Sequence, residues 1–111
     1  MIAITDEVLD EMVAAIVQAS DPERIVLFGS RADGAQDIDS DIDLLIVERE
    51  PFGPERSRRR ESLKIRRALS GFRIAKDILV YSQDDVAEWR DSPNHVLTYA
   101  LERGRCLYAR P

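Results

Sequence analysis

Three short apolar runs, and the lengths of chain between them, constrain the fold of this sequence more than any other feature. The runs are RIVLF (Arg24–Phe28), a segment from Asp41 to Glu48, and RIAKDILVY (Arg73–Tyr81). Each is short and rich in β-branched or aromatic residues, which is typical of buried strands. Arg31–Ser40, between the first two, is shorter than the dozen or so residues of a parallel crossover. We therefore expect an antiparallel first pair, and a parallel pair across the longer second connection.

Helical patterns surround these strands. Residues 5–20 have a Thr5 cap, acidic residues in the first turn and an apolar stripe, and residues 55–69 form a second, basic helix that ends before Gly71. Ser82 opens a short helix, Ser92-Pro93 opens another that ends at Gly104, and RCLYA forms a final short strand. The predicted fold class is α/β (α+β), a small mixed β-sheet with helices packed against it, in a single domain over residues 1–111.

Composition excludes several classes of protein. Hydrophobic residues make up 44% of the chain, which argues against disorder. The one cysteine, Cys106, cannot form an internal disulfide, and we expect it to be a buried thiol in an apolar strand. No apolar run approaches the length of a membrane span, and the start of the chain is acidic, unlike a signal peptide. We expect a soluble, cytoplasmic protein without a membrane partner.

Charge is distributed unevenly along the chain. The net charge is −5, which argues against general nucleic-acid binding, yet residues 55–69 hold seven Lys or Arg and two Glu. This helix can be a solvated face with Leu63, Ile65 and Leu69 inward, or a docking surface for a partner or for RNA phosphates. The single histidine, His95, has no second ligand near it in sequence, so we expect a structural role. The sequence leaves a homo-oligomer open.

Aspartates gather at the start of the second strand. The stretch DIDSDIDLLIV holds Asp37, Asp39, Asp41 and Asp43 at alternate positions. Because side chains alternate along a strand, Asp41 and Asp43 share one face and can hold one or two Mg²⁺ ions, whereas Asp37 and Asp39 remain in the solvated approach loop. An EF-hand interpretation fails because Ile42 occupies the turn position that requires glycine.

The third strand carries an isolated acid. Asp77 lies among apolar residues, where a carboxylate is costly unless it is paired or bound to metal. If the second and third strands are neighbours, Asp77 can complete a site of three carboxylates with Asp41 and Asp43. The alternative is a structural ion pair with Arg73 or Lys76.

A Gly-Ser turn follows the first strand. Gly29 permits close approach of the backbone, and Ser30 with exposed N–H groups can hold phosphate oxygens. Arg31 can contact a phosphate or can be an ordinary surface residue. The Gly-Ser turn alone is weak evidence, but its spacing to the Asp-x-Asp strand and to a further strand aspartate is far more specific.

These motifs carry a resemblance. LFGSRADGAQDIDSDIDLLIV resembles the signature of the DNA polymerase β-like nucleotidyltransferase superfamily, and nearly the whole chain resembles its minimal nucleotidyltransferases, the MNT proteins. The resemblance implies that Gly29 and Ser30 bind a nucleoside triphosphate. It further implies that Asp41 and Asp43 ligate Mg²⁺ and that Asp77 activates an acceptor hydroxyl.

The resemblance also implies a partner. MNT proteins are commonly paired with a HEPN-domain toxin as its antitoxin, and some transfer AMP from ATP to a tyrosine of that toxin. The expected activity is therefore Mg²⁺-dependent nucleotidyl transfer. Two alternatives remain: a non-catalytic module that masks the toxin, and transfer to a small molecule or an RNA.

Overall fold

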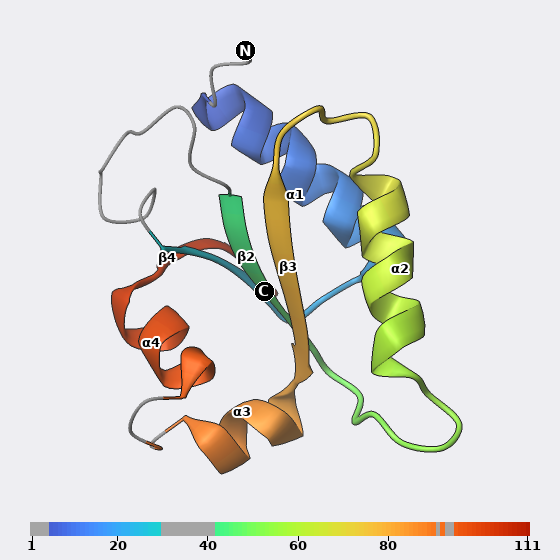
Figure 1. The fold of residues 1–111 in the computed structure, drawn as a ribbon, viewed down its shortest axis with the longest axis vertical. Coiled ribbons are helices and arrows are strands. Elements are labelled where there is room, and N and C mark those ends of the chain that lie inside the picture. The colour runs from blue at the N-terminus through green and yellow to red at the C-terminus, as the bar shows by residue number, and fades with distance from the viewer. Residues whose placement is uncertain (1–4, 30–41, 91, 93–94) are drawn as a thin grey trace.

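The protein is built on one four-stranded sheet. The structure, a computed structural model, describes residues 5–29, 42–90, 92 and 95–111. The strands follow the order β3-β2-β1-β4 (Figure 1). Their bounds are β1, Arg24–Phe28; β2, Ile42–Glu48; β3, Lys76–Ser82; and β4, Arg105–Ala109. Strand β1 is antiparallel to both of its neighbours, and β2 is parallel to β3. The mixed sheet and both predicted strand orientations are therefore confirmed.

Four helices in the described part of the chain complete the fold. Their bounds are α1, Asp6–Ser20; α2, Arg58–Ala68; α3, Gln83–Trp89; and α4, Val96–Arg103. The Thr5 hydroxyl accepts a hydrogen bond from the Val8 N–H at 3.2 Å and so caps α1 as predicted. Ser82 and Asp85 form the predicted capping box of α3. No helix in this described part is long and apolar enough to cross a membrane.

The helices form two layers, one on each face of the sheet (Figure 1). Helices α1 and α2 cover one face and pack on Ile42, Leu44 and Ile46 of β2 within the larger core. Helix α4 covers the other face and packs with Leu45 and Val47 of the same strand in a smaller core. Alternation along β2 therefore sends even-numbered side chains to the α1–α2 face and odd-numbered ones to the α3–α4 face.

Three expectations from the sequence are wrong. Helix α4 begins at Val96 rather than at Ser92-Pro93, because the His95 Nδ1 accepts a hydrogen bond from the Leu97 N–H and caps the helix there. Ile65 and Leu69 are buried, but Leu63 is 45% exposed, because it lies on the opposite side of α2 from Ile65. Cys106 is exposed rather than buried, since β4 is an edge strand.

Gly104, between α4 and β4, generates the first prediction. A Cβ there would lie 2.2 Å from the Ala100 carbonyl oxygen and 2.3 Å from Val26 Cγ1. Gly104→Ala should therefore lower the free energy of unfolding by about 1–3 kcal/mol, as overpacking does. Urea unfolding measures this. Gly71→Ala is the matched control, because a Cβ there meets nothing within 4 Å; equal losses in both variants would contradict the packing explanation.

Candidate functional site

Two predicted acids lie side by side at one end of the sheet. In the parallel pairing of β2 with β3, Asp43 is the direct register partner of Asp77. Neighbouring strands are about 4.8 Å apart, and paired residues point to the same face. The sheet therefore brings together two carboxylates that are separated by more than thirty residues of chain.

The acids point away from the main core. Asp43 alternates with the even-numbered side chains that pack under α1 and α2, so it shares the α3–α4 face with Leu45. Asp43 is partly buried and Asp77 is exposed. Both acids can therefore be reached from solvent, although the residues that follow them along each strand are apolar and packed.

Gly29 lies directly against the Asp43 carboxylate. Phe28, the residue before it, is the register partner of Asp43 across the β1–β2 pair. Gly29 has φ +80°, and a Cβ at this position would lie 2.3 Å from Asp43 Oδ2. Glycine is therefore required here both for the backbone conformation and for the close approach. Gly29 and the acid strand therefore meet at one place.

Lys76 has a structural role beside this pair. Its ammonium donates hydrogen bonds to the carbonyl oxygens of Phe72 and Ile74, at 2.8 and 2.9 Å. Burial lowers the pKa of Lys76, and the nearby Arg66 lowers it further. In the described part of the chain, neither Lys76 nor Arg73 forms an ion pair with Asp77. The structure thus offers no support for the ion-pair alternative.

The donor set suits a hard divalent cation. Carboxylate oxygens are the ligands that Mg²⁺ prefers, and Asp43 and Asp77 present theirs from adjacent strands. Within the described residues, no group of three His, Cys, Asp or Glu side chains forms a metal site. Asp41, the third predicted ligand, and Ser30 and Arg31, the predicted phosphate contacts, lie outside the described residues. Asp43 and Asp77 therefore suit Mg²⁺ as two ligands of a site that needs at least one further ligand.

Comparison with known families decides the assignment. The family model "Polymerase beta, Nucleotidyltransferase" matches residues 11–111. The chain belongs to this nucleotidyltransferase family. No curated protein matches the chain.

Two solved structures share the fold of this nucleotidyltransferase. One is a toxin-antitoxin crystal structure with AMP-PNP, with a TM-score of 0.59 and 19% identity over 91% of this chain and 73% of that chain. The other is a candidate nucleotidyltransferase from Sulfolobus solfataricus, with a TM-score of 0.62 and 20% identity over 94% of this chain and 79% of that one. At these identities the likeness concerns the fold.

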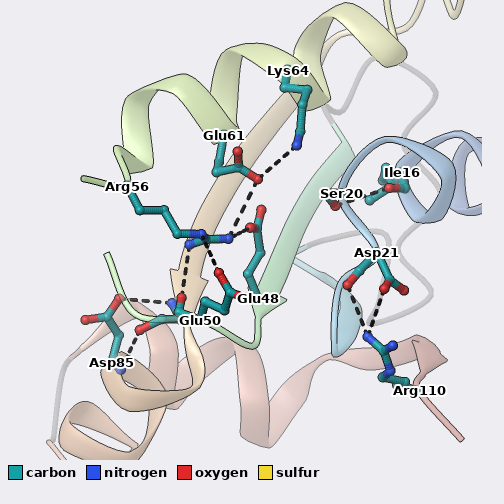
Figure 2. A network of polar contacts seen from close by, with 11 residues as sticks. Ile16, Ser20, Asp21, Glu48, Glu50, Arg56, Glu61, Lys64, Asp85 and Arg110 are labelled. Atoms are coloured by element: carbon teal, nitrogen blue, oxygen red, sulfur yellow. Dashed lines mark hydrogen bonds and ion pairs between the residues drawn. The ribbon is translucent and has the colours of Figure 1, made fainter. Parts of the chain in front are cut away.

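A second group of acids lies at the opposite end of β2. Glu48 is five residues beyond Asp43, about 16 Å along the strand, and its side chain is 2% exposed. Figure 2 shows Arg56 bridging the carboxylates of Glu48, Glu50 and Glu61. Glu48 is the next residue after Ile42, Leu44 and Ile46 on the face of β2 that packs in the larger core. The alternation of the sequence could therefore have identified it as a buried acid.

Glu48 has a strongly shifted pKa. Burial raises the pKa to about 7 and the neighbouring Glu61 carboxylate adds to the shift, while Arg56 opposes it. Within the described residues, Glu48 Oε2 is buried and has no hydrogen-bond partner. A proton on Glu48 would let this oxygen donate to Glu61. Shifted pKa values often mark active sites, but this pair lies far from Asp43, so we interpret it as structural.

The contact between Gly29 and Asp43 generates the second prediction. Gly29→Ala should lower the free energy of unfolding by roughly 1–3 kcal/mol, because the added methyl group displaces the carboxylate and the positive φ is strained. Removing the carboxylate with Asp43→Ala should reduce this cost, so the two substitutions should be non-additive in urea unfolding. Strict additivity would show that the methyl group does not meet Asp43. Gly53→Ala, with open space around it, is the control.

The third prediction concerns pH. Because the pKa of Glu48 is raised from 4.5 to about 7, the folded state holds a proton that the unfolded state releases. Stability should therefore fall by up to about 3 kcal/mol as pH rises from 4.5 through 7. Glu48→Gln should abolish this fall, as measured by urea unfolding between pH 5 and 8. Glu50→Gln, at a mostly exposed neighbour, should leave the fall intact. A pH profile unchanged by Glu48→Gln would contradict the assignment.

Proposed function

We propose that this nucleotidyltransferase is the antitoxin of a toxin–antitoxin pair and transfers AMP from ATP to a tyrosine of a HEPN-domain toxin. The observation that carries the proposal is the register pairing of Asp43 with Asp77 beside Gly29, in a chain of this family. Further support comes from the similar fold of a toxin-antitoxin structure that contains AMP-PNP. We place the protein in the cytoplasm, which suits its free cysteine, Cys106.

The proposed roles follow the resemblance to the family and, for Gly29, Asp43 and Asp77, the positions of these residues in the sheet. Gly29, Ser30 and Arg31 bind the triphosphate, with Gly29 giving the phosphates close access to the backbone. Asp41, Asp43 and Asp77 would hold Mg²⁺, which would supply neutralisation of the phosphate charge and a lower pKa for the acceptor hydroxyl. Asp77 is exposed whereas Asp43 is partly buried, so of these two acids Asp77 is the more open to an incoming acceptor.

The proposed reaction is an in-line displacement. The acceptor oxygen bonds to the α-phosphorus of ATP while the bond from that phosphorus to the bridging oxygen of the β-phosphate breaks, and pyrophosphate leaves. Asp77 accepts the hydroxyl proton. The site contributes mainly position and charge, as is general for phosphoryl transfer. A tyrosine presented by another protein can reach Asp77, because this side chain is exposed.

The fourth prediction tests the proposal. The chain should be incubated with ATP, Mg²⁺ and the protein encoded by the neighbouring gene, and the partner weighed by intact-mass spectrometry. The partner should gain one or more AMP units. Asp43→Asn and Asp77→Asn should each slow this gain by roughly 10²–10³-fold, as loss of one charge-stabilising group does. Chelation of Mg²⁺ should stop it.

A control variant and two outcomes complete this test. Glu88→Gln alters an exposed acid on α3 and should leave the rate unchanged. If the partner is neutralised in a stable complex but gains no mass, the chain is a masking module. If nucleotide appears instead on RNA or a small molecule added to the reaction, the acceptor is wrong while the transferase assignment stands.

A further inference from the structure

Helix α2 presents an unusual outward surface. Leu63 is 45% exposed, and the positions three and four residues to either side of it are Arg59, Arg60, Arg66 and Arg67, all exposed. Within the described part of the chain, none of these arginines forms an ion pair. We call Leu63 and these arginines the basic face. An apolar residue ringed by arginines resembles a binding surface, where arginine is enriched.

The neighbouring cations of α2 are arranged differently. Arg58 pairs with Asp85 at 2.8 Å and Lys64 pairs with Glu61 at 3.3 Å, so both are neutralised within the chain. Arg56, just before the helix, pairs with Glu48. Among the cations of α2, therefore, those without an ion pair in the described part of the chain are the four on its outward side. Like charges close together on a helix are destabilising unless a partner neutralises them.

Helix α1 carries a matching set of opposite charge. Asp6, Glu7, Asp10 and Glu11 occupy its first two turns and are all exposed. We call these residues the acidic end of α1. Among the described residues, the only ion pair made by this set joins Asp6 to Arg105, at 3.6 Å. Ala14, one turn further along the same exposed side, is small and uncharged.

The two charged sets lie apart on one layer of the molecule. Figure 1 shows α1 and α2 on the same side of the sheet, with the N-terminal end of α1 directed away from α2. The acidic end of a chain therefore cannot neutralise its own basic face. A second copy, related by a two-fold axis, can place its acidic end on the basic face, and the same contact then forms twice.

We propose that the chain forms a two-fold symmetric homodimer through its α1–α2 layer. The four carboxylates of one copy meet the four arginines of the other, and Leu63 packs near Ala14. The observations favour a second copy over nucleic acid, because the chain carries a net charge of −5 and the acidic end lies on the same layer. Asp43 and Asp77 lie on the opposite face of the sheet, so the dimer leaves them accessible. The inference is independent of the proposed reaction.

The fifth prediction concerns this dimer. Sedimentation equilibrium across a range of protein concentrations should show a monomer–dimer equilibrium that shifts to monomer as salt is raised. Arg66→Glu with Arg67→Glu should raise the dimer Kd by at least about 100-fold, because like charges then oppose each other. Asp10→Lys with Glu11→Lys should do the same. An equimolar mixture of the two double variants should recover a dimer, since both contacts are then complementary again.

A control variant and three possible results test whether the homodimer forms through the α1–α2 layer. Asp84→Lys with Glu88→Lys reverses charges on α3, in the other layer, and should leave the dimer intact. Circular dichroism should show that all variants are folded. A monomeric wild type at high concentration, or a mixture that fails to recover a dimer, would overturn the proposal. So would wild-type protein that associates only with RNA or with an acidic protein of another kind.

Discussion

The parallel register between β2 and β3 is the constraint on which the candidate site depends. It sets Asp43 opposite Asp77, and a shift of one residue would turn one of the two acids toward the α1–α2 core. The apolar side chains that follow each acid resist such a shift, because Leu44 and Ile78 are buried in that core. Packing on one face of the sheet thus positions the two acids of the candidate site on the other. Gly29 adds a third element, since only glycine leaves room beside the carboxylate.

Much of this arrangement could be predicted from local patterns. The alternation in DIDLLIV and the connection lengths were sufficient to predict a mixed sheet with β1 antiparallel and β3 parallel to β2. A pattern with a period of two specifies which residues share a face, and the lone acid among the apolar residues of β3 led us to expect a partner. Asp77 is in fact exposed, so water also solvates its charge. The pairing of Asp43 with Asp77 remained conditional on strand adjacency, which only tertiary structure provides. The roles of Asp41, Ser30 and Arg31 remain predictions.

Apart from the start of α4, which the His95 cap sets, the failures have a common physical origin, because each depends on what covers a residue. Leu63 has the composition of a core residue, yet the α2 stripe through Ile65 and Leu69 is the one that meets the sheet. Cys106 lies in an apolar run, but β4 is an edge strand. Glu48 is the reverse case, a charged residue that proves to be buried. A carboxylate at a core position is tolerated only because Arg56, from a later loop, pairs with it, and the sequence does not show this contact.

The two layers of the molecule therefore serve separable purposes. The α3–α4 face carries Asp43 and Asp77 side by side at one end of the sheet, where Asp77 is exposed. The α1–α2 face holds the larger core and, on its outside, opposite charges that cannot meet within one chain. If a second copy covers that outer surface, association and chemistry act on opposite sides of a thin sheet. Strand β2 then couples the two layers, because its side chains pack in both cores. Any change that shifts the register of β2 against β3 would move Asp43 and the residues of the α1–α2 core together.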